Sequence, residues 1–306
     1  PLINSGGVRQ APWAEGQNVR HLEPMGFIKF DLLGLSTLKM MEGAIEHILR
    51  RHHGIENPTF AQVREYYDEN LHPDRIDLDN QEVYENIFHK GKWAGVFQFT
   101  EQGAQGFCTK VKPRNIIDVS AITSIYRPGP LAANVHDEYV EAKESPHYIK
   151  YLNDDAHDIT QETFGFLIFQ EQIALLAHKL GGLTLDEGNM LRKVLTKKGT
   201  GKGSVKGRLH DKFISGCLAN KIARDEAQAL WDKFEYFSGY GFNKSHAVCY
   251  SVISYQCAWL LTYYEAEWVA AFLDKEPESR KERAINTAKS LGYSILWFFK
   301  TNRNFN

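Results

Sequence analysis

The sequence predicts a mainly α-helical protein that begins with a short α/β piece. Apolar residues recur at spacings of three and four along most of the 306 residues, which is the period of an amphipathic helix. Short strands and loops are expected within residues 1–35, where Gly6, Gly7 and Pro24 interrupt the pattern. This piece has too few strands for a sheet of its own. We therefore expect it to be the edge of a larger sheet whose other strands lie outside this sequence.

Start and stop signals delimit the predicted helices in order along the chain. Ser36 is a typical N-cap residue and precedes a run of apolar residues at helical spacing. The Gly-Gly pair at 181–182 is expected to end the helix that begins at Gln170. The predicted helices span residues 37–51, 59–67, 82–89, 101–108, 116–125, 170–180, 184–193, 209–220, 224–237, 247–264 and 278–291. Residues 132–157 are polar and weakly periodic, so we expect a surface excursion there.

The charge of the chain is nearly balanced overall but uneven along the sequence. Apolar residues make up 43% of the chain and the formal net charge is −2, which is ordinary for a folded protein. Between Arg192 and Lys212, however, basic residues crowd together and Asp211 is the one acid. Because an average charge hides such patches, this segment predicts a surface for a polyanion.

Cysteine and histidine give no sign of a metal site. The four cysteines form no CxxC pair, and the twelve histidines show no HExxH spacing. Unpaired cysteines in a chain of this length indicate a reducing, cytoplasmic location. Residues 247–264 carry no charge and are about as long as a minimal membrane span. Their serines, threonine, glutamine and tyrosines favour a buried helix instead, so no membrane contact is expected.

The run from Phe237 to Ala247 has the composition of a phosphate-handling loop. Its sequence is FSGYGFNKSHA, and an apolar, aromatic helix follows it at once. Glycine lets a backbone approach a ligand closely. Lys244, Ser245 and His246 stand where the helix begins, and helix N-termini favour anions. We therefore expect this loop to bind phosphate groups.

A second informative segment runs from Gly26 to Leu35 and predicts a short apolar strand. Lys29 and Asp31 are two residues apart, so they share one face of that strand. Taken alone, such a pair is usually explained by a salt bridge.

Six segments of the chain, in the same order, closely resemble those of the C-family bacterial replicative DNA polymerases, the polymerase III alpha subunits. They are GFIKFDLLGL at 26–35, GVFQF at 95–99, YRPGPL at 126–131, FQEQ at 169–172, MLRK at 190–193 followed by a Lys-Lys pair at 197–198, and FSGYGFNKSHA at 237–247. The resemblance spans residues 1–273. It implies that residues 1–35 are the C-terminal piece of a nucleotidyltransferase-like palm with its last strand, that 36–275 are a helical fingers domain, and that 276–306 begin a following domain that is truncated or divergent.

The resemblance also implies roles for individual residues. Asp31 would be a catalytic carboxylate that binds Mg²⁺. The residues expected to bind the incoming nucleotide are Lys29, Arg192, Lys193, Lys197, Lys198, Asn243, Lys244, Ser245 and His246. Those expected to contact DNA are Tyr126, Arg127, Lys202 and Lys206. Lys202 and Lys206 lie in a glycine-lysine segment, 199–207, that is equally well explained as a solvated linker. We assign Gln170, Glu171 and Gln172 to a helix start with capping and core contacts, and Phe97 and Phe99 to the core.

The sequence departs from the family at one decisive point. Two-metal nucleotide transfer needs two or three converging carboxylates, and the family's paired-aspartate motif upstream of Asp31 has no match here. Asp77 and Asp79 have the right spacing but lie downstream in a polar turn.

We therefore interpret the chain as part of a DNA-directed DNA polymerase. The chain by itself is expected to be inactive. The implied partners are primer-template DNA, deoxynucleoside triphosphates, the rest of the polymerase polypeptide, and the sliding clamp and other replisome subunits through regions outside this sequence. The alternatives are a non-catalytic nucleic-acid-binding module with the same fold and a structural subunit with a decayed site. Salt-sensitive DNA binding would distinguish the polymerase and the nucleic-acid-binding module from the structural subunit.

Overall fold

The computed structural model describes residues 3–10, 26, 28, 30, 32–132, 134–195, 204–238 and 241–294. Contacts divide the chain into two units, Pro1–Ser36 and Thr37–Asn306. The first unit contains an antiparallel hairpin of β1 (Ile3–Ser5) and β2 (Val8–Gln10), in which Ile3 lies opposite Gln10. Gly6 and Gly7 close the hairpin with φ angles of 60° and 82°, which glycine adopts without strain.

The strand expected over residues 26–35 is not formed in the described part of that segment. Residues 28, 30 and 32–35 have no regular structure, and Gly26 lies in a turn. Ile28, Phe30, Leu32 and Leu33 are all at least 77% exposed. The physical reason is that a strand is stabilised by hydrogen bonds to a neighbouring strand, and alternation along the sequence does not supply that neighbour.

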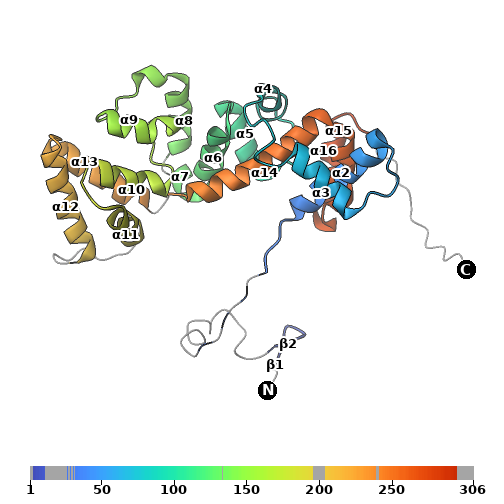
Figure 1. The fold of residues 1–306 in the computed structure, drawn as a ribbon, viewed down its shortest axis with the longest axis horizontal. Coiled ribbons are helices and arrows are strands. Elements are labelled where there is room, and N and C mark those ends of the chain that lie inside the picture. Colours follow the sequence, from blue (N-terminus) through green and yellow to red (C-terminus); the bar gives the residue numbers. More distant parts are fainter. Residues whose placement is uncertain are drawn as a thin grey trace, which may run out of the picture. The chain divides into compact units, whose positions relative to one another are not determined.

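The remainder of the described chain is helical, and Figure 1 shows the order of its elements. These elements are α2 (Ser36–His53), α3 (Phe60–Asn70), α4 (Gln81–Val83), the π-helix η3 (Tyr84–His89), α5 (Gln102–Val111), α6 (Ile116–Ile125), α7 (Pro128–Ala132), α8 (Val135–Glu144), η4 (Pro146–Tyr148), α9 (Asp154–Thr160), η5 (Gln161–Thr163), α10 (Gln170–Lys179), α11 (Leu185–Leu195), α12 (Val205–Ala219), α13 (Arg224–Ser238), α14 (Lys244–Tyr263), α15 (Glu265–Lys275) and α16 (Glu278–Ser290). The mainly α-helical fold predicted from the sequence is confirmed.

Helix α14 passes through the larger of two hydrophobic cores, where it packs against α6, α15 and η3. Two of its buried polar side chains have partners on neighbouring segments, whereas the buried Ser251 Oγ has no hydrogen-bond partner among the described residues. Ser254 Oγ donates to the Phe97 carbonyl at 2.8 Å, and Gln256 Nε2 donates to the Leu71 carbonyl at 2.7 Å. These bonds satisfy polar groups in the uncharged part of the helix, residues 247–263, which is buried in protein. No helix in the described ranges combines the length and apolarity needed to cross a bilayer.

The smaller core is formed mainly by α10, α11, α12 and α13 around Phe213, Trp231 and Phe234. Two glycines let α12 approach the end of α10. A Cβ atom on Gly216 would lie 1.9 Å from the carbonyl oxygen of Gly181, which is far inside van der Waals contact. Residue 216 must therefore be a glycine, with no side chain, for the two segments to pack as they do.

Residues 132–157, expected to be a surface excursion, are mostly exposed or half-buried where described, but they are more regular than expected. This stretch contains α8 and α9, and the side chain of Tyr139 on α8 is fully buried. The periodic signal is weak because part of the inward face of α8 is charged. Lys143 forms an ion pair with Asp118, whose side chain is also buried. A charged residue thus occupies a core position that hydrophobic periodicity cannot detect.

Gly216→Ala is expected to lower the free energy of unfolding by about 1–3 kcal/mol, because the added methyl group must displace backbone. Urea denaturation followed by circular dichroism measures the change. Gly106→Ala on α5 is the matched control, since a Cβ atom there meets no neighbour within 4 Å. The control should be neutral or slightly stabilising. Equal stability of the two variants would show that the contact between Gly181 and Gly216 is looser than described.

Candidate functional site

The loop before α14 is hydrogen-bonded to the segment before α10. Phe242 N donates to the Ile168 carbonyl at 3.0 Å, and Gln170 N donates to the Phe242 carbonyl at 2.9 Å, which makes a short parallel bridge between Phe169 and Phe242. The bridge brings the start of α10 next to the start of α14. Two segments that the sequence marks separately, FQEQ and GFNKSH, therefore form one site.

The amino end of α14 already has an anionic partner in the chain itself. Asn243 is the N-cap, and its Oδ1 accepts from His246 N at 2.9 Å. Glu171 on α10 accepts from Lys244 N at 2.9 Å and from Asn243 Nδ2 at 2.7 Å. A carboxylate thus occupies the position where the sequence led us to expect a phosphate, since both anions suit the free N–H groups of a helix start.

The side chain of Lys244 extends from this helix start to a second carboxylate. Its Nζ lies 2.7 Å from both Oε1 and Oε2 of Glu162 on η5. The same ammonium lies 5.7 Å from the centre of the Phe169 ring, within the range of a cation–π contact. Lys244 is therefore held between a carboxylate and an aromatic face.

Gln170 connects this loop to the basic helix α11. Its Oε1 accepts from Arg192 Nη1 at 3.2 Å, and its Nε2 donates to the Gly241 carbonyl at 2.9 Å. Lys193, the next residue on α11, is exposed. The structure thus brings Arg192 and Lys244, which are 52 residues apart in the sequence, to the same helix start.

Aromatic rings continue the site along the exposed side of α14. The guanidinium carbon of Arg127 lies 4.7 Å from the centre of the Phe242 ring. Phe242 lies 5.5 Å from the ring of His246, which in turn lies 4.0 Å from the ring of Tyr250. Burial lowers the pKa of the Arg127 guanidinium below its ordinary value. Tyr126 points elsewhere and stacks on Phe107 of α5.

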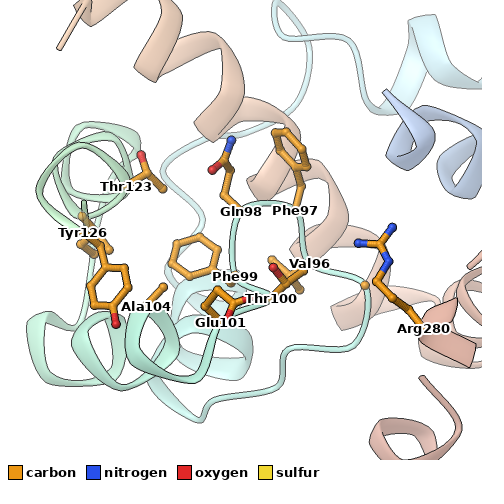
Figure 2. A pocket seen from close by; sticks show the side chains of 12 residues that line it. Val96, Phe97, Gln98, Phe99, Thr100, Glu101, Ala104, Thr123, Tyr126 and Arg280 are labelled. Atoms are coloured by element: carbon orange, nitrogen blue, oxygen red, sulfur yellow. The ribbon is translucent and has the colours of Figure 1, made fainter. Parts of the chain in front are cut away.

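The GVFQF segment lines a pocket of about 400 Å³ beside this row of rings. Figure 2 shows Gln98 and Phe97 on one side of the pocket, with Thr123 and Tyr126 on the other. Phe99 is fully buried, which confirms the core assignment from the sequence. Phe97 is only partly buried, and its ring lies 5.3 Å from that of Tyr250.

Lys206 lies in the smaller core region and has a carboxylate partner there. Its Nζ is 2.9 Å from Glu235 Oε1, and its side chain is 14% exposed. Burial alone would raise the pKa of the Glu235 carboxyl, but hydrogen bonds from Lys206 and Trp231 hold that pKa below its ordinary value. Any DNA contact by Lys206 therefore has to compete with Glu235. Ser245 is exposed in the first turn of α14, and the other predicted site residues, Lys29, Asp31, Lys197, Lys198 and Lys202, lie outside the described residues.

Acidic side chains do not form a metal-binding cluster in the described ranges. No group of three or more His, Cys, Asp or Glu residues converges there. Asp77 Oδ1 accepts from Asp79 N at 3.0 Å, so this pair closes a local turn.

The sequence did not single out Glu162, and it assigned Glu171 to a helix start with capping and core contacts. Glu171 lies in a predicted helix and Glu162 lies outside any, and no local pattern distinguishes either from a surface acid. Only their contacts with Lys244 and Asn243, which are 72 to 82 residues further along the chain, identify them. Gln172 does cap its helix as expected, since its Oε1 accepts from the backbone N–H groups of Ile168 and Phe169.

Comparison with known families assigns most of the helical part of the chain to a known class of protein domain. The family of bacterial DNA polymerase III alpha subunit finger domains matches residues 37–221, and the chain belongs to this family.

Full-length relatives match a longer part of the chain. It is 32% identical to the DNA polymerase III subunit alpha of Aquifex aeolicus over 276 residues and 32% identical to that of Campylobacter jejuni over 278 residues. It is 33% identical to the Thermus aquaticus subunit over 284 residues. Each match covers 90% of this chain but only about a fifth of the relative.

Asn243→Ala is expected to lower the free energy of unfolding by about 1–2 kcal/mol, because it removes the cap of α14 and one partner of Glu171. Asn153→Ala is the matched variant, since Asn153 caps α9 through a 2.9 Å bond to Ala156 N. Urea denaturation of both should show the larger loss for Asn243→Ala. Equal losses would mean that the bond to Glu171 contributes nothing to stability.

Proposed function

We propose that this chain supplies the incoming-nucleotide-binding fingers of a DNA-directed DNA polymerase. The observation that carries the proposal is that Arg192 from α11 and Lys244 from α14 both contact the start of α10, Arg192 through Gln170 and the Lys244 ammonium through the ring of Phe169. Two cationic side chains near one helix start are of the kind a triphosphate requires. Membership of the finger-domain family and the names of the relatives support the same function.

In this proposal the side chains near the start of α10 neutralise the charge of the triphosphate and hold it in position for the reaction. Transfer of a nucleotide to a primer 3′ hydroxyl releases pyrophosphate, and negative charge develops on the leaving oxygens. In this proposal the Lys244 ammonium and the Arg192 guanidinium contact those oxygens, and His246 and Ser245 supply further donors from the first turn of α14. Lys193 assists from α11, and Asn243 fixes the helix start. Fixed donors of this kind stabilise the transition state without reorganising during the reaction.

The remaining parts of the proposal concern residues outside the described ranges. We assign Lys29, Lys197 and Lys198 to the triphosphate, and Asp31 to the catalytic metal site as the carboxylate that ends the palm. Mg²⁺ bound there would neutralise charge on the reacting phosphates. With one carboxylate of the usual two or three, this chain alone should not extend a primer.

The proposed domain division keeps residues 1–35 with the palm, 36–275 with the fingers and 276–306 with a following domain. Tyr126, Arg127, Lys202 and Lys206 are proposed to contact DNA, and Arg127 lies beside the loop through its contact with Phe242. The proposed partners are primer-template DNA, deoxynucleoside triphosphates, the rest of the polymerase polypeptide, the sliding clamp and other replisome subunits, and the proposed location is cytoplasmic.

Lys244→Ala and His246→Ala, made in the complete polymerase subunit, should each raise the nucleotide KM or lower kcat on the order of 10-fold. Affinity for primer-template DNA should stay unchanged, because the loop is assigned to the triphosphate. Steady-state kinetics at varied nucleotide concentration and DNA-binding titrations measure the two effects. Lys92→Ala is the control, since Lys92 forms a similar ion pair with Glu265 at 3.2 Å. Loss of DNA affinity with unchanged nucleotide kinetics would assign the loop to the DNA backbone.

Asp31→Asn in the complete subunit should nearly abolish primer extension and leave DNA binding almost intact, because a metal-binding carboxylate acts chiefly in the transition state. Asp77→Asn makes the same chemical change at an exposed turn and should have no effect. Extension within a few-fold of wild type by Asp31→Asn would make Asp31 a salt-bridge partner of Lys29.

A further inference from the structure

Glu162 is the residue that neutralises Lys244 in this structure. Both of its carboxylate oxygens lie 2.7 Å from the Lys244 ammonium. The ion pair remains partly open to solvent, since the side chains of Lys244 and Glu162 are 33% and 29% exposed. An anion arriving from solvent therefore has access to the ammonium.

The position of Glu162 is set by a well-braced turn. The next residue, Thr163, is fully buried, and its Oγ1 donates to the Phe166 carbonyl at 2.7 Å. Gln172 Nε2 donates to the same Oγ1 at 2.7 Å, which ties the turn to the start of α10. Because the backbone on which Glu162 stands is anchored in this way, its carboxylate is directed at Lys244 more firmly than that of an ordinary surface glutamate.

Glu171, the other carboxylate of the site, makes a different kind of contact. It accepts from the main-chain N–H of Lys244 and from the side-chain amide of Asn243, so it stabilises the helix start. Glu162 alone of these two carboxylates neutralises the Lys244 side chain. The two acids therefore have separable roles.

We propose that Glu162 is a positioning residue for nucleotide binding: it acts as a competing anion that holds Lys244 and that the triphosphate must displace. This inference rests on the proposed function, since it takes the triphosphate as the ligand of Lys244. A carboxylate and a triphosphate are both negative and repel each other. Contact between Glu162 and the Lys244 ammonium therefore weakens binding of the triphosphate to the same ammonium. The triphosphate carries several negative charges and Glu162 carries one, which favours exchange when nucleotide is present.

The size of the expected effect follows from the exposure of the pair. Partly exposed ion pairs stabilise a structure only modestly. Removing the charge of Glu162 should therefore tighten nucleotide binding by about 2- to 5-fold. If Glu162 served only to brace the loop, its removal would weaken binding instead.

The test uses the complete polymerase subunit bound to a dideoxy-terminated primer-template and titrated with dATP opposite thymine. Glu162→Gln should lower the Kd of dATP by about 2- to 5-fold and leave the Kd of the primer-template unchanged. In a Lys244→Ala background the same substitution should have no effect, because the ammonium for which the two anions compete is absent. Glu265→Gln is the matched control: it breaks an ion pair with Lys92 of similar exposure near the opposite end of α14, and should change neither Kd.

The possible results separate this inference from the proposed function. A higher or unchanged dATP Kd for Glu162→Gln, in a subunit where Lys244→Ala weakens dATP binding, would overturn the inference alone. A gain that persists in the Lys244→Ala background would overturn it too, since the effect would then not act through Lys244. If Lys244→Ala leaves the dATP Kd unchanged, the proposed role of Lys244 fails, and this inference fails with it. Glu162→Asp, which keeps the charge on a shorter side chain, should give an intermediate Kd.

Discussion

The site depends on the two backbone hydrogen bonds between Phe242 and the segment that precedes α10. Because the backbone forms them, they set the loop in place largely independently of its side chains. They put Glu171 against the first residue of α14, and they put Gln170 between Gly241 and Arg192. Every contact that joins the two helix starts follows from this short bridge.

Electrostatic balance is the second constraint. A loop rich in donors and positive charge has to fold in the absence of ligand, and unpaired charges near the protein interior are costly. The chain meets this requirement with carboxylates on η5 and α10, and it uses the same solution for Lys206 with Glu235 and for Lys143 with Asp118. The positive surface is thus neutralised locally, which is consistent with the small net charge of the whole chain.

Hydrophobic periodicity was sufficient to predict most helices, because most of them bury an apolar face. It failed for α8, where Lys143 lies toward the core, and for the segment before Leu35, where a strand would require a neighbour that the sequence does not specify. The loop at Lys244 was recognisable because its unusual residues are adjacent in the sequence. Its counter-charges were not, since Glu162 and Glu171 approach it only through tertiary packing.

The division into two hydrophobic cores has a consequence for how this protein opens. Phe237, at the end of α13, packs against both cores, and the loop that leads to α14 follows it directly. Although both cores lie within the one compact unit Thr37–Asn306, we expect them to open as separate cooperative regions, whose amide hydrogens exchange with solvent at different rates. The helices α10 to α13 can thus lose protection while α14 keeps it. The loop before Lys244 follows Phe237, which contacts both cores, so a ligand bound at this loop and touching both cores would couple their opening.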